Sequence, residues 1–175
     1  MHASIPARLR VCLFFVILLA AVVTTVSRAH AENGDALDDA LHCLALNIYF
    51  EARGEPKLGR LAVGHVVLNR VNDSRFPNTV CGVIKDGGET TLHRCQFSWW
   101  CDGKSDEPTD EAAWAASQEA AQKVFWALAP DLTGGALWYH AHYVDPSWRH
   151  RFVKSAVIGQ HVFYQRPAQV ASARR

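Results

Sequence analysis

Glu51 is the residue whose position in this sequence most clearly suggests chemistry. It lies in the stretch LHCLALNIYFEARGEP (residues 41–56). The apolar residues Leu37, Leu41, Leu44 and Ile48 recur at steps of four, three and four, which is one face of a helix, and Glu51 is the next position on that face. Burial of an ionised carboxylate costs several kcal/mol, so a glutamate at the end of an apolar stripe needs an explanation.

A carboxyl group in an apolar setting is suited to general acid catalysis. Burial disfavours the charged form and therefore raises the pKa of the group. A carboxylic acid that is still protonated near neutral pH can donate its proton to a leaving group, and the oxygen of a glycosidic bond is the best-known acceptor. The alternative interpretation is an ordinary glutamate at a helix end whose carboxylate reaches solvent.

Glu55 follows four residues later in a different setting, between Gly54 and Pro56. We place it at the start of the next helix, where negative charge is favoured, and expect it to stay ionised. Glycosidases with two catalytic carboxylates place them on opposite sides of the scissile bond. Two side chains four apart at one helix end project the same way, so this pair cannot straddle a sugar. Asp86 and Glu89 are candidates for an opposing carboxylate, although their spacing does not single them out.

The elements that would position Glu51 are helices. The apolar spacing predicts a helix over residues 36–53, with Gly54 at its C′ position. Pro56 fits the first position of a second helix over 56–73, and a shorter helix is predicted within 76–88.

The spacing of apolar and polar residues changes in the later part of the chain. Residues 89–108 have no regular period and are predicted to form a structured loop. Thr109 fits the N-cap of a third long helix, whose predicted buried stripe comprises Trp114, Gln118, Ala121, Phe125 and Leu128. Partial alternation predicts strands within 136–144 and at 161–165. The predicted fold class is α+β: a mostly helical single domain with a small strand region in its C-terminal part.

The N-terminus is typical of an export signal. Arg8 and Arg10 precede a run of sixteen uncharged residues, and Ala29 and Ala31 then fit a small-x-small cleavage site. We interpret residues 1–31 as a secretory signal peptide. The alternative is an uncleaved anchor helix, for which sixteen residues fall short of the roughly 20 that span a bilayer.

The exported part is predicted to be one catalytic domain over residues 32–165 with a flexible tail at 166–175. Removal of the signal takes away three arginines, so the formal net charge of +1 becomes slightly negative. This leaves no basic field that would recruit nucleic acid. We expect a monomer, periplasmic or secreted, with no stable membrane insertion after signal cleavage.

Four cysteines remain after the signal, at positions 43, 81, 95 and 101. An even number in an exported chain suggests two disulfides, for which three pairings exist. We predict Cys43–Cys81, which would join the first helix to the short helix, and Cys95–Cys101, which would close the loop around QFSWW. Paired cysteines leave no free thiol for a cysteine nucleophile, and their spacing is wider than that of common zinc sites.

A histidine pair raises the question of a metal site. His140 and His142 alternate, so on a strand they would point to the same face, with Asp145 beyond them. Zinc would need a further ligand, for which His65 and His161 are candidates. The sequence has no H-E-x-x-H motif, so we favour ordinary polar strand residues and predict no metal.

Five segments together resemble a known family. They are LALNIYFEARGEPKLGRLAVGHVVLNRV, FPNTVCGVI, CQFSWWCDG, GGALWYHAHYVDPSW and IGQHVFY, which cover about residues 40–165 in this order. The sequence is similar to the bacterial cell-wall hydrolase family of the spore-cortex-lytic enzymes (SleB-like). The most specific part is E-A-R-G-E followed by V-x-x-V-x-x-N-R and F-P-N-T-V.

The resemblance implies a function and a site. Family members resemble the lysozyme-like fold of lytic transglycosylases, which cleave peptidoglycan glycan strands between N-acetylmuramic acid and N-acetylglucosamine and leave an anhydromuramic end. The first glutamate of E-A-R-G-E is the expected catalytic acid, which falls on Glu51. A single acid/base carboxylate suffices for that reaction, so no cofactor is expected. Candidate substrate-binding residues are Glu55, Gln96 beside Phe97, Tyr139 in the aromatic run, and His140.

This sequence departs from the spore enzymes in two respects. It shows no N-terminal peptidoglycan-binding repeat, and it has the four cysteines. Both features favour general wall turnover over a spore role. Two other classes remain as alternatives, namely an exported metal- or cysteine-dependent wall peptidase and a non-catalytic glycan-binding module.

Overall fold

The computed structural model describes residues 34–87 and 95–167 of the chain. The predicted signal peptide, Glu89 and nearly all of the predicted tail lie outside these residues. The described residues from Asp39 onward form one unit. Among the described residues, no helix has both the length and the apolar character needed to cross a membrane.

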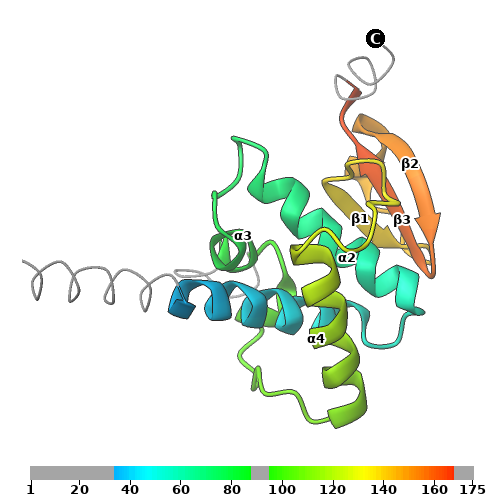
Figure 1. Cartoon of the computed structure of the whole chain (residues 1–175). Coiled ribbons are helices and arrows are strands. Elements are labelled where there is room, and N and C mark those ends of the chain that lie inside the picture. The colour runs from blue at the N-terminus through cyan, green and yellow to red at the C-terminus, as the bar shows by residue number, and fades with distance from the viewer. Residues whose placement is uncertain (1–33, 88–94, 168–175) are drawn as a thin grey trace, which may run out of the picture. The chain divides into compact units, whose positions relative to one another are not determined.

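Helices make up most of the described chain (Figure 1). A first helix covers residues 34–52. It is followed by α2 (Lys57–Val71), α3 (Val80–Lys85), the 3₁₀ helix η1 (Ser98–Cys101) and α4 (Glu111–Phe125). The three predicted long helices and the short one are therefore confirmed, and η1 lies inside the predicted loop.

The C-terminal part forms a three-stranded antiparallel sheet. Its strands are β1 (Trp138–Ala141), β2 (Val153–Ile158) and β3 (His161–Gln165), in the order β1-β3-β2, and the 3₁₀ helix η2 (Ser147–Arg151) lies between β1 and β2 along the chain. The predicted α+β class is confirmed. β2 was not predicted, because it is a half-exposed edge strand whose sequence VKSAVI has little alternation.

Helix α2 is the central element (Figure 1). One side packs with the first helix and α4, where Leu61 and Val67 join the main core, and Ala62 and Val66 pack with Phe163 of the sheet. Valine has a modest intrinsic helix propensity. Burial of α2 on both sides outweighs the modest helix propensity of its valines and stabilises the helix.

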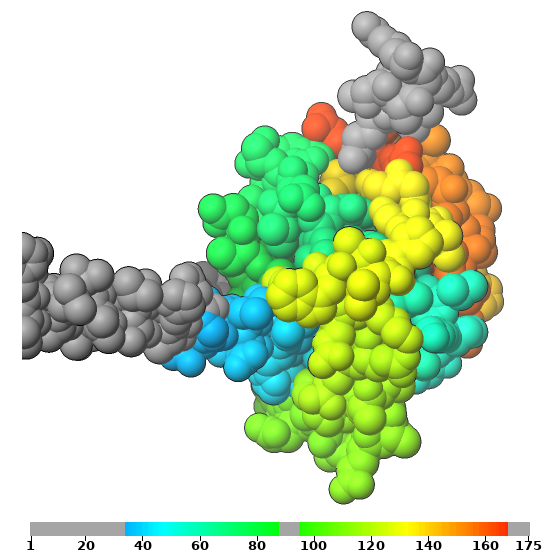
Figure 2. All heavy atoms as spheres, viewed as in Figure 1, coloured from blue at the N-terminus to red at the C-terminus, as the bar shows by residue number. Residues whose placement is uncertain are grey.

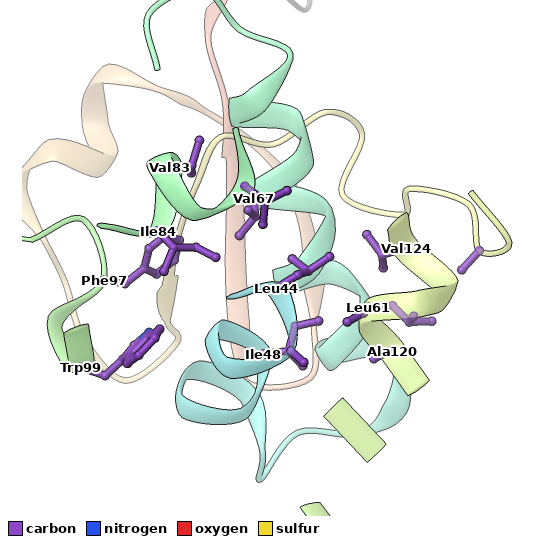
Figure 3. Close-up of a cluster of buried hydrophobic side chains, with 14 residues drawn as sticks. Leu44, Ile48, Leu61, Val67, Val83, Ile84, Phe97, Trp99, Ala120 and Val124 are labelled. Carbon is purple, nitrogen blue, oxygen red and sulfur yellow. The ribbon is translucent and has the colours of Figure 1, made fainter. Parts of the chain in front are cut away.

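The main core gathers side chains from the first helix, α2, α3, η1 and α4 (Figure 3). Leu44 and Ile48 of the predicted stripe are fully buried within it. Gly64 lets the long helices approach closely, because a Cβ at this position would lie 3.0 Å from Ile48 Cδ1 and 3.3 Å from Val124 Cγ2.

Helix α4 differs from its prediction in cap and in buried face. The N-cap is Asp110, whose side chain accepts a hydrogen bond from the Ala113 N–H, and not Thr109. Gln118 is exposed, and Leu128 is 73 % exposed beyond the end of the helix. Ala121 is buried as predicted, and Trp114 and Phe125 pack against the core while partly buried. The other buried residues of the helix are Ser117, Ala120 and Val124, which were not predicted. Small side chains are favoured on this face because α4 packs closely on α2. The segment between α4 and β1 is visible on the surface (yellow in Figure 2).

The connection between the first helix and α2 also differs in detail. The helix ends at Ala52, and the Glu55 N–H donates to the Ala52 carbonyl at 3.0 Å. Gly54 does not have the positive φ of a left-handed C′ glycine. Pro56 is the N-cap of α2 rather than its first residue.

Both predicted disulfides are present, Cys43–Cys81 between the first helix and α3, and Cys95–Cys101 around η1.

Candidate active site

Glu51 lies in the last turn of the first helix, at the edge of the core. Ile48 one turn earlier is fully buried, and Glu51 itself is half-buried. The Tyr139 hydroxyl, from β1, donates a hydrogen bond to Glu51 Oε2 at 3.0 Å. The sheet therefore holds one oxygen of this carboxyl group and leaves the other for a different partner.

Burial raises the pKa of the Glu51 carboxyl above its ordinary value. The Tyr139 hydrogen bond and the positive charge of Arg70 act in the opposite direction and lower it, with a smaller effect. Burial also raises the pKa of the Tyr139 hydroxyl well above its usual range, so this group remains a hydrogen-bond donor. The result is a carboxyl group that is protonated at higher pH than an exposed glutamate.

Two residues at the end of α2 hold the strand in place against the helices. Asn69 donates to the Ala136 carbonyl at 3.1 Å, and Arg70 Nε donates to the Leu137 carbonyl at 2.8 Å. The Arg70 guanidinium is almost completely buried, over the rings of Phe76 and Phe97. These contacts fix the backbone just before Tyr139.

Glu55 is buried beside the same turn, with only 8 % of its surface exposed. Its Oε2 accepts a hydrogen bond from the Gln160 backbone N–H at 2.9 Å. Its Oε1 lies 3.8 Å from His161 Nδ1. Glu55 therefore faces the turn between β2 and β3, while Glu51 faces Tyr139.

A pocket of about 220 Å³ opens where the first helix meets the sheet. One wall is formed by residues 50–55, which include Glu51 and Glu55. The other wall comes from the ends of the strands, with Ala141, Tyr143, Gln160 and His161. The Tyr143 ring is 75 % exposed at this opening, which is where an aromatic face can stack on a bound ring.

A profile of the Cell Wall Hydrolase family matches residues 54–164. The chain belongs to this family. Two of its curated relatives are spore cortex-lytic enzymes. The protein from Bacillus cereus is 36 % identical over 137 residues, which are 77 % of this chain and 47 % of the relative. The protein from Halalkalibacterium halodurans is 33 % identical over 129 residues, 72 % of this chain and 34 % of the relative. The chain thus spans less than half the length of these relatives.

Two solved structures share the fold of this cell wall hydrolase domain. The catalytic domain of the Bacillus cereus SleB protein superposes with a TM-score of 0.54 at 32 % identity, covering 73 % of this chain and 91 % of that domain. The catalytic domain of the germination-specific lytic transglycosylase SleB from Bacillus anthracis gives a TM-score of 0.55 at 33 % identity, covering 72 % and 93 %. The family resemblance drawn from the sequence is confirmed.

The structure of this family member brings three of the predicted site residues together: Glu51, Glu55 and Tyr139. Gln96 is exposed, its backbone N–H donates to the Asp86 carbonyl, and it does not line the pocket of Glu51.

His140 faces the opposite side of the sheet. It lines a separate pocket of about 300 Å³. One ring nitrogen lies 2.9 Å from the Ala141 carbonyl and the other 2.9 Å from the Tyr164 hydroxyl. With both nitrogens engaged, His140 acts in this structure as a link between two strands.

The described residues contain no group of three or more histidine, cysteine or carboxylate side chains arranged to hold a metal ion. His142 Nδ1 lies 3.2 Å from the Gln160 carbonyl.

Sequence reasoning missed three contributors to the site. They are Arg70, whose charge acts on Glu51, and Gln160 and His161, which face Glu55. Asn69 and Arg70 are the N-R pair of V-x-x-V-x-x-N-R, and both make structural hydrogen bonds to the backbone before β1. The signal in the sequence that could have suggested the closeness of Arg70 to Glu51 is the presence of an arginine on an otherwise apolar helix.

Proposed function

We propose that the chain cleaves peptidoglycan glycan strands between N-acetylmuramic acid and N-acetylglucosamine, as a lytic transglycosylase with Glu51 as its single acid/base. The observation that carries this proposal is the state of Glu51, a half-buried carboxyl with a raised pKa, held by Tyr139 at the wall of an open pocket. Membership of the cell wall hydrolase family supports the substrate class.

Tyr139 determines which oxygen of Glu51 transfers the proton. Oε2 accepts the hydrogen bond from Tyr139, and the carbonyl oxygen of a carboxylic acid is its better acceptor, so we place the acidic proton on Oε1. In the first half-step this proton passes to the glycosidic oxygen as its bond to the sugar carbon breaks. In the second, a hydroxyl of the same muramic sugar attacks that carbon, and its proton passes to Glu51. The carboxyl is restored and no water is consumed.

The charge of Arg70 supports the intermediate stage. After the first proton transfer Glu51 is an anion in a partly buried place, which is unfavourable. The guanidinium of Arg70 and the hydroxyl of Tyr139 both favour that anion. Glu51 is thereby able both to lose the proton and to regain it.

The surroundings support a single acid rather than two opposed carboxylates. Glu55 is the other carboxylate that lines the pocket among the described residues, and its oxygens face the protein at Gln160 and His161. The four described cysteines are all in disulfides, so none of them offers a thiol nucleophile for a peptidase.

The cellular setting belongs to the same proposal. We infer an exported protein, periplasmic or secreted, that acts on the wall as a monomer in general turnover. The signal-like residues 1–31 and the two disulfides support export.

Mass spectrometry of the products tests the reaction type. Purified protein is incubated with isolated peptidoglycan, and the released fragments are weighed. A transglycosylase leaves anhydromuramic ends, which are lighter by one water than the reducing ends left by hydrolysis. Reducing ends alone would show a hydrolase, and release of peptides without glycan cleavage would show a peptidase.

A further inference from the structure

The Glu55 carboxylate occupies a slot between two parts of the chain that are far apart in sequence. Glu55 is 8 % exposed, and its Oε2 accepts the N–H of Gln160, 105 residues later, at 2.9 Å. Gln160 lies in the turn between β2 and β3. This contact therefore fastens the turn to the start of α2.

Two glycines make room for this carboxylate. A Cβ on Gly159 would lie 1.8 Å from Glu55 Oε2, and a Cβ on Gly59 would lie 2.8 Å from the same oxygen. Gly159 also has a φ of +58°, which suits the first central position of a tight hairpin turn. The turn and the helix are thus shaped to receive the carboxylate.

The contact continues from the turn to the catalytic carboxyl. Next to Gln160, the buried His161 places Nδ1 3.8 Å from Glu55 Oε1. The His161 ring packs edge-on against Tyr139, with the ring centroids 5.1 Å apart at 84°. Tyr139 in turn donates to Glu51.

The strand that carries Tyr139 is held at the same end. The Gln160 carbonyl accepts the N–H of His142 at 2.7 Å, directly after β1. His161 is paired with Ala141 in the register of β1 and β3. A shift of the turn would therefore move both the strand and the ring that contact Tyr139.

We propose that Glu55 is a positioning residue: it pins the β2–β3 turn and, through His161 and the end of β1, holds Tyr139 in place to donate to Glu51. This inference rests on the proposed function of Glu51. It separates the two glutamates of E-A-R-G-E into a group that transfers the proton and a group that fixes the geometry around it.

Two substitutions of Glu55 separate reach from charge. Glu55→Gln keeps the length and an oxygen for the Gln160 N–H but removes the charge. Glu55→Asp keeps the charge but is one methylene too short to reach that N–H. We expect Glu55→Gln to retain kcat within about 3-fold and Glu55→Asp to lose about 10- to 100-fold, since misplacement by about 1 Å can cost 100-fold in rate. KM on soluble glycan strands should change by less than about 3-fold in both, because positioning affects the chemical step.

A double-mutant cycle tests the route through Tyr139. If Glu55 acts through that residue, Glu55→Asp should cost less than about 3-fold when added to Tyr139→Phe, although it costs more in the wild type. Rates are measured well below the lowest melting temperature of the set, so that a general loss of stability does not contribute. Costs that multiply in the double variant would overturn the proposal.

Gly159→Ala supplies an independent approach with a matched control. The new methyl group must displace the Glu55 carboxylate, and kcat should fall to about the level of Glu55→Asp. Gly135→Ala imposes the same kind of backbone strain, since Gly135 has a φ of +80°, but a Cβ there meets nothing within 4 Å. Gly135→Ala should lower the melting temperature and leave kcat unchanged. Equal kcat in the two variants would contradict the positioning role.

The outcome for Glu51 keeps the two levels apart. An active Glu51→Gln variant would refute the proposed function itself. An inactive Glu51→Gln variant together with a Glu55→Gln variant that is more impaired than Glu55→Asp would refute only the positioning role, and would show that the charge of Glu55 takes part in the reaction.

Discussion

Glu51 is subject to opposing influences that suit a group which must both give and take a proton. Burial raises the pKa of its carboxyl, while the Tyr139 hydrogen bond and the Arg70 charge lower it. Burial alone would favour a permanently protonated acid. A strong ion pair alone would favour a permanent carboxylate. The combination allows both states within the reaction.

Removal of the Tyr139 hydroxyl should shift the pH dependence of the reaction. That hydroxyl stabilises the charged form of Glu51, so its loss in Tyr139→Phe raises the Glu51 pKa further. The alkaline limb of the kcat/KM profile, where the acid loses its proton, should therefore move to higher pH. Tyr143→Phe is the control, because Tyr143 is exposed at the opening and should leave the limb in place. A shift to lower pH in Tyr139→Phe would show that the hydroxyl does not favour the anion.

The raised pKa of Glu51 also predicts how its substitution affects stability. A carboxyl whose pKa is raised in the folded state stabilises the fold below its unfolded pKa of about 4.3, and this contribution is lost as the pH rises through the folded value. Glu51→Gln resembles the protonated form at every pH. Thermal melts of the two proteins should therefore be similar at about pH 4, and the variant should melt higher at pH 8. A stabilisation that is greatest in acid would contradict the direction of the pKa shift.

At the scale of the elements, the close approach of three helices sets the position of Glu51. Gly64 of α2 faces Ile48 of the first helix and Val124 of α4. Ile48 lies one turn before Glu51 in the same helix. A larger residue at position 64 would push this helix away from α2.

We predict that Gly64→Val lowers the free energy of unfolding by about 1 to 3 kcal/mol, the usual cost of inserting methyl groups into a packed core. Denaturant unfolding followed by circular dichroism measures this change. Gly54→Ala is the control, since a Cβ at Gly54 meets nothing within 4 Å and its φ is not positive. A Gly64→Val variant as stable as the wild type would show that the helices can separate without cost.

At the scale of the whole molecule, the site is a junction between the helical part and the sheet. The hydrogen bond from Tyr139 joins Glu51 to a residue 88 positions away, and the Gln160 contact joins Glu55 to one 105 positions away. The first helix carries Glu51, and the turn that follows it carries Glu55. The sheet supplies the groups that fix them.

This division explains what could be predicted from the sequence. The apolar spacing before Glu51 predicted both its helix and its unusual setting, because that information is local. The partners of Glu51 and Glu55 could not be predicted, because nothing local in β1 or in the β2–β3 turn encodes what lies against it. The prediction for the buried face of α4 was only partly right, for a related reason: Ala121 is buried and Trp114 and Phe125 pack against the core, whereas Gln118 is exposed. The small residues Ser117 and Ala120 were not expected on this face, and close packing on α2 favours them there beside Ala121.

The activity of Glu51→Gln on isolated peptidoglycan tests the central claim most directly. The substitution keeps the shape of the side chain and an acceptor for Tyr139 but removes the transferable proton. Glycan cleavage should fall by at least about 100- to 10,000-fold, the range for one acid–base group, while the variant remains folded. Glu119→Gln is the matched control, because Glu119 is an exposed carboxylate on α4 that pairs with Lys123, and its loss should leave cleavage unchanged. Near-normal cleavage by Glu51→Gln would contradict the assignment of Glu51 as the acid.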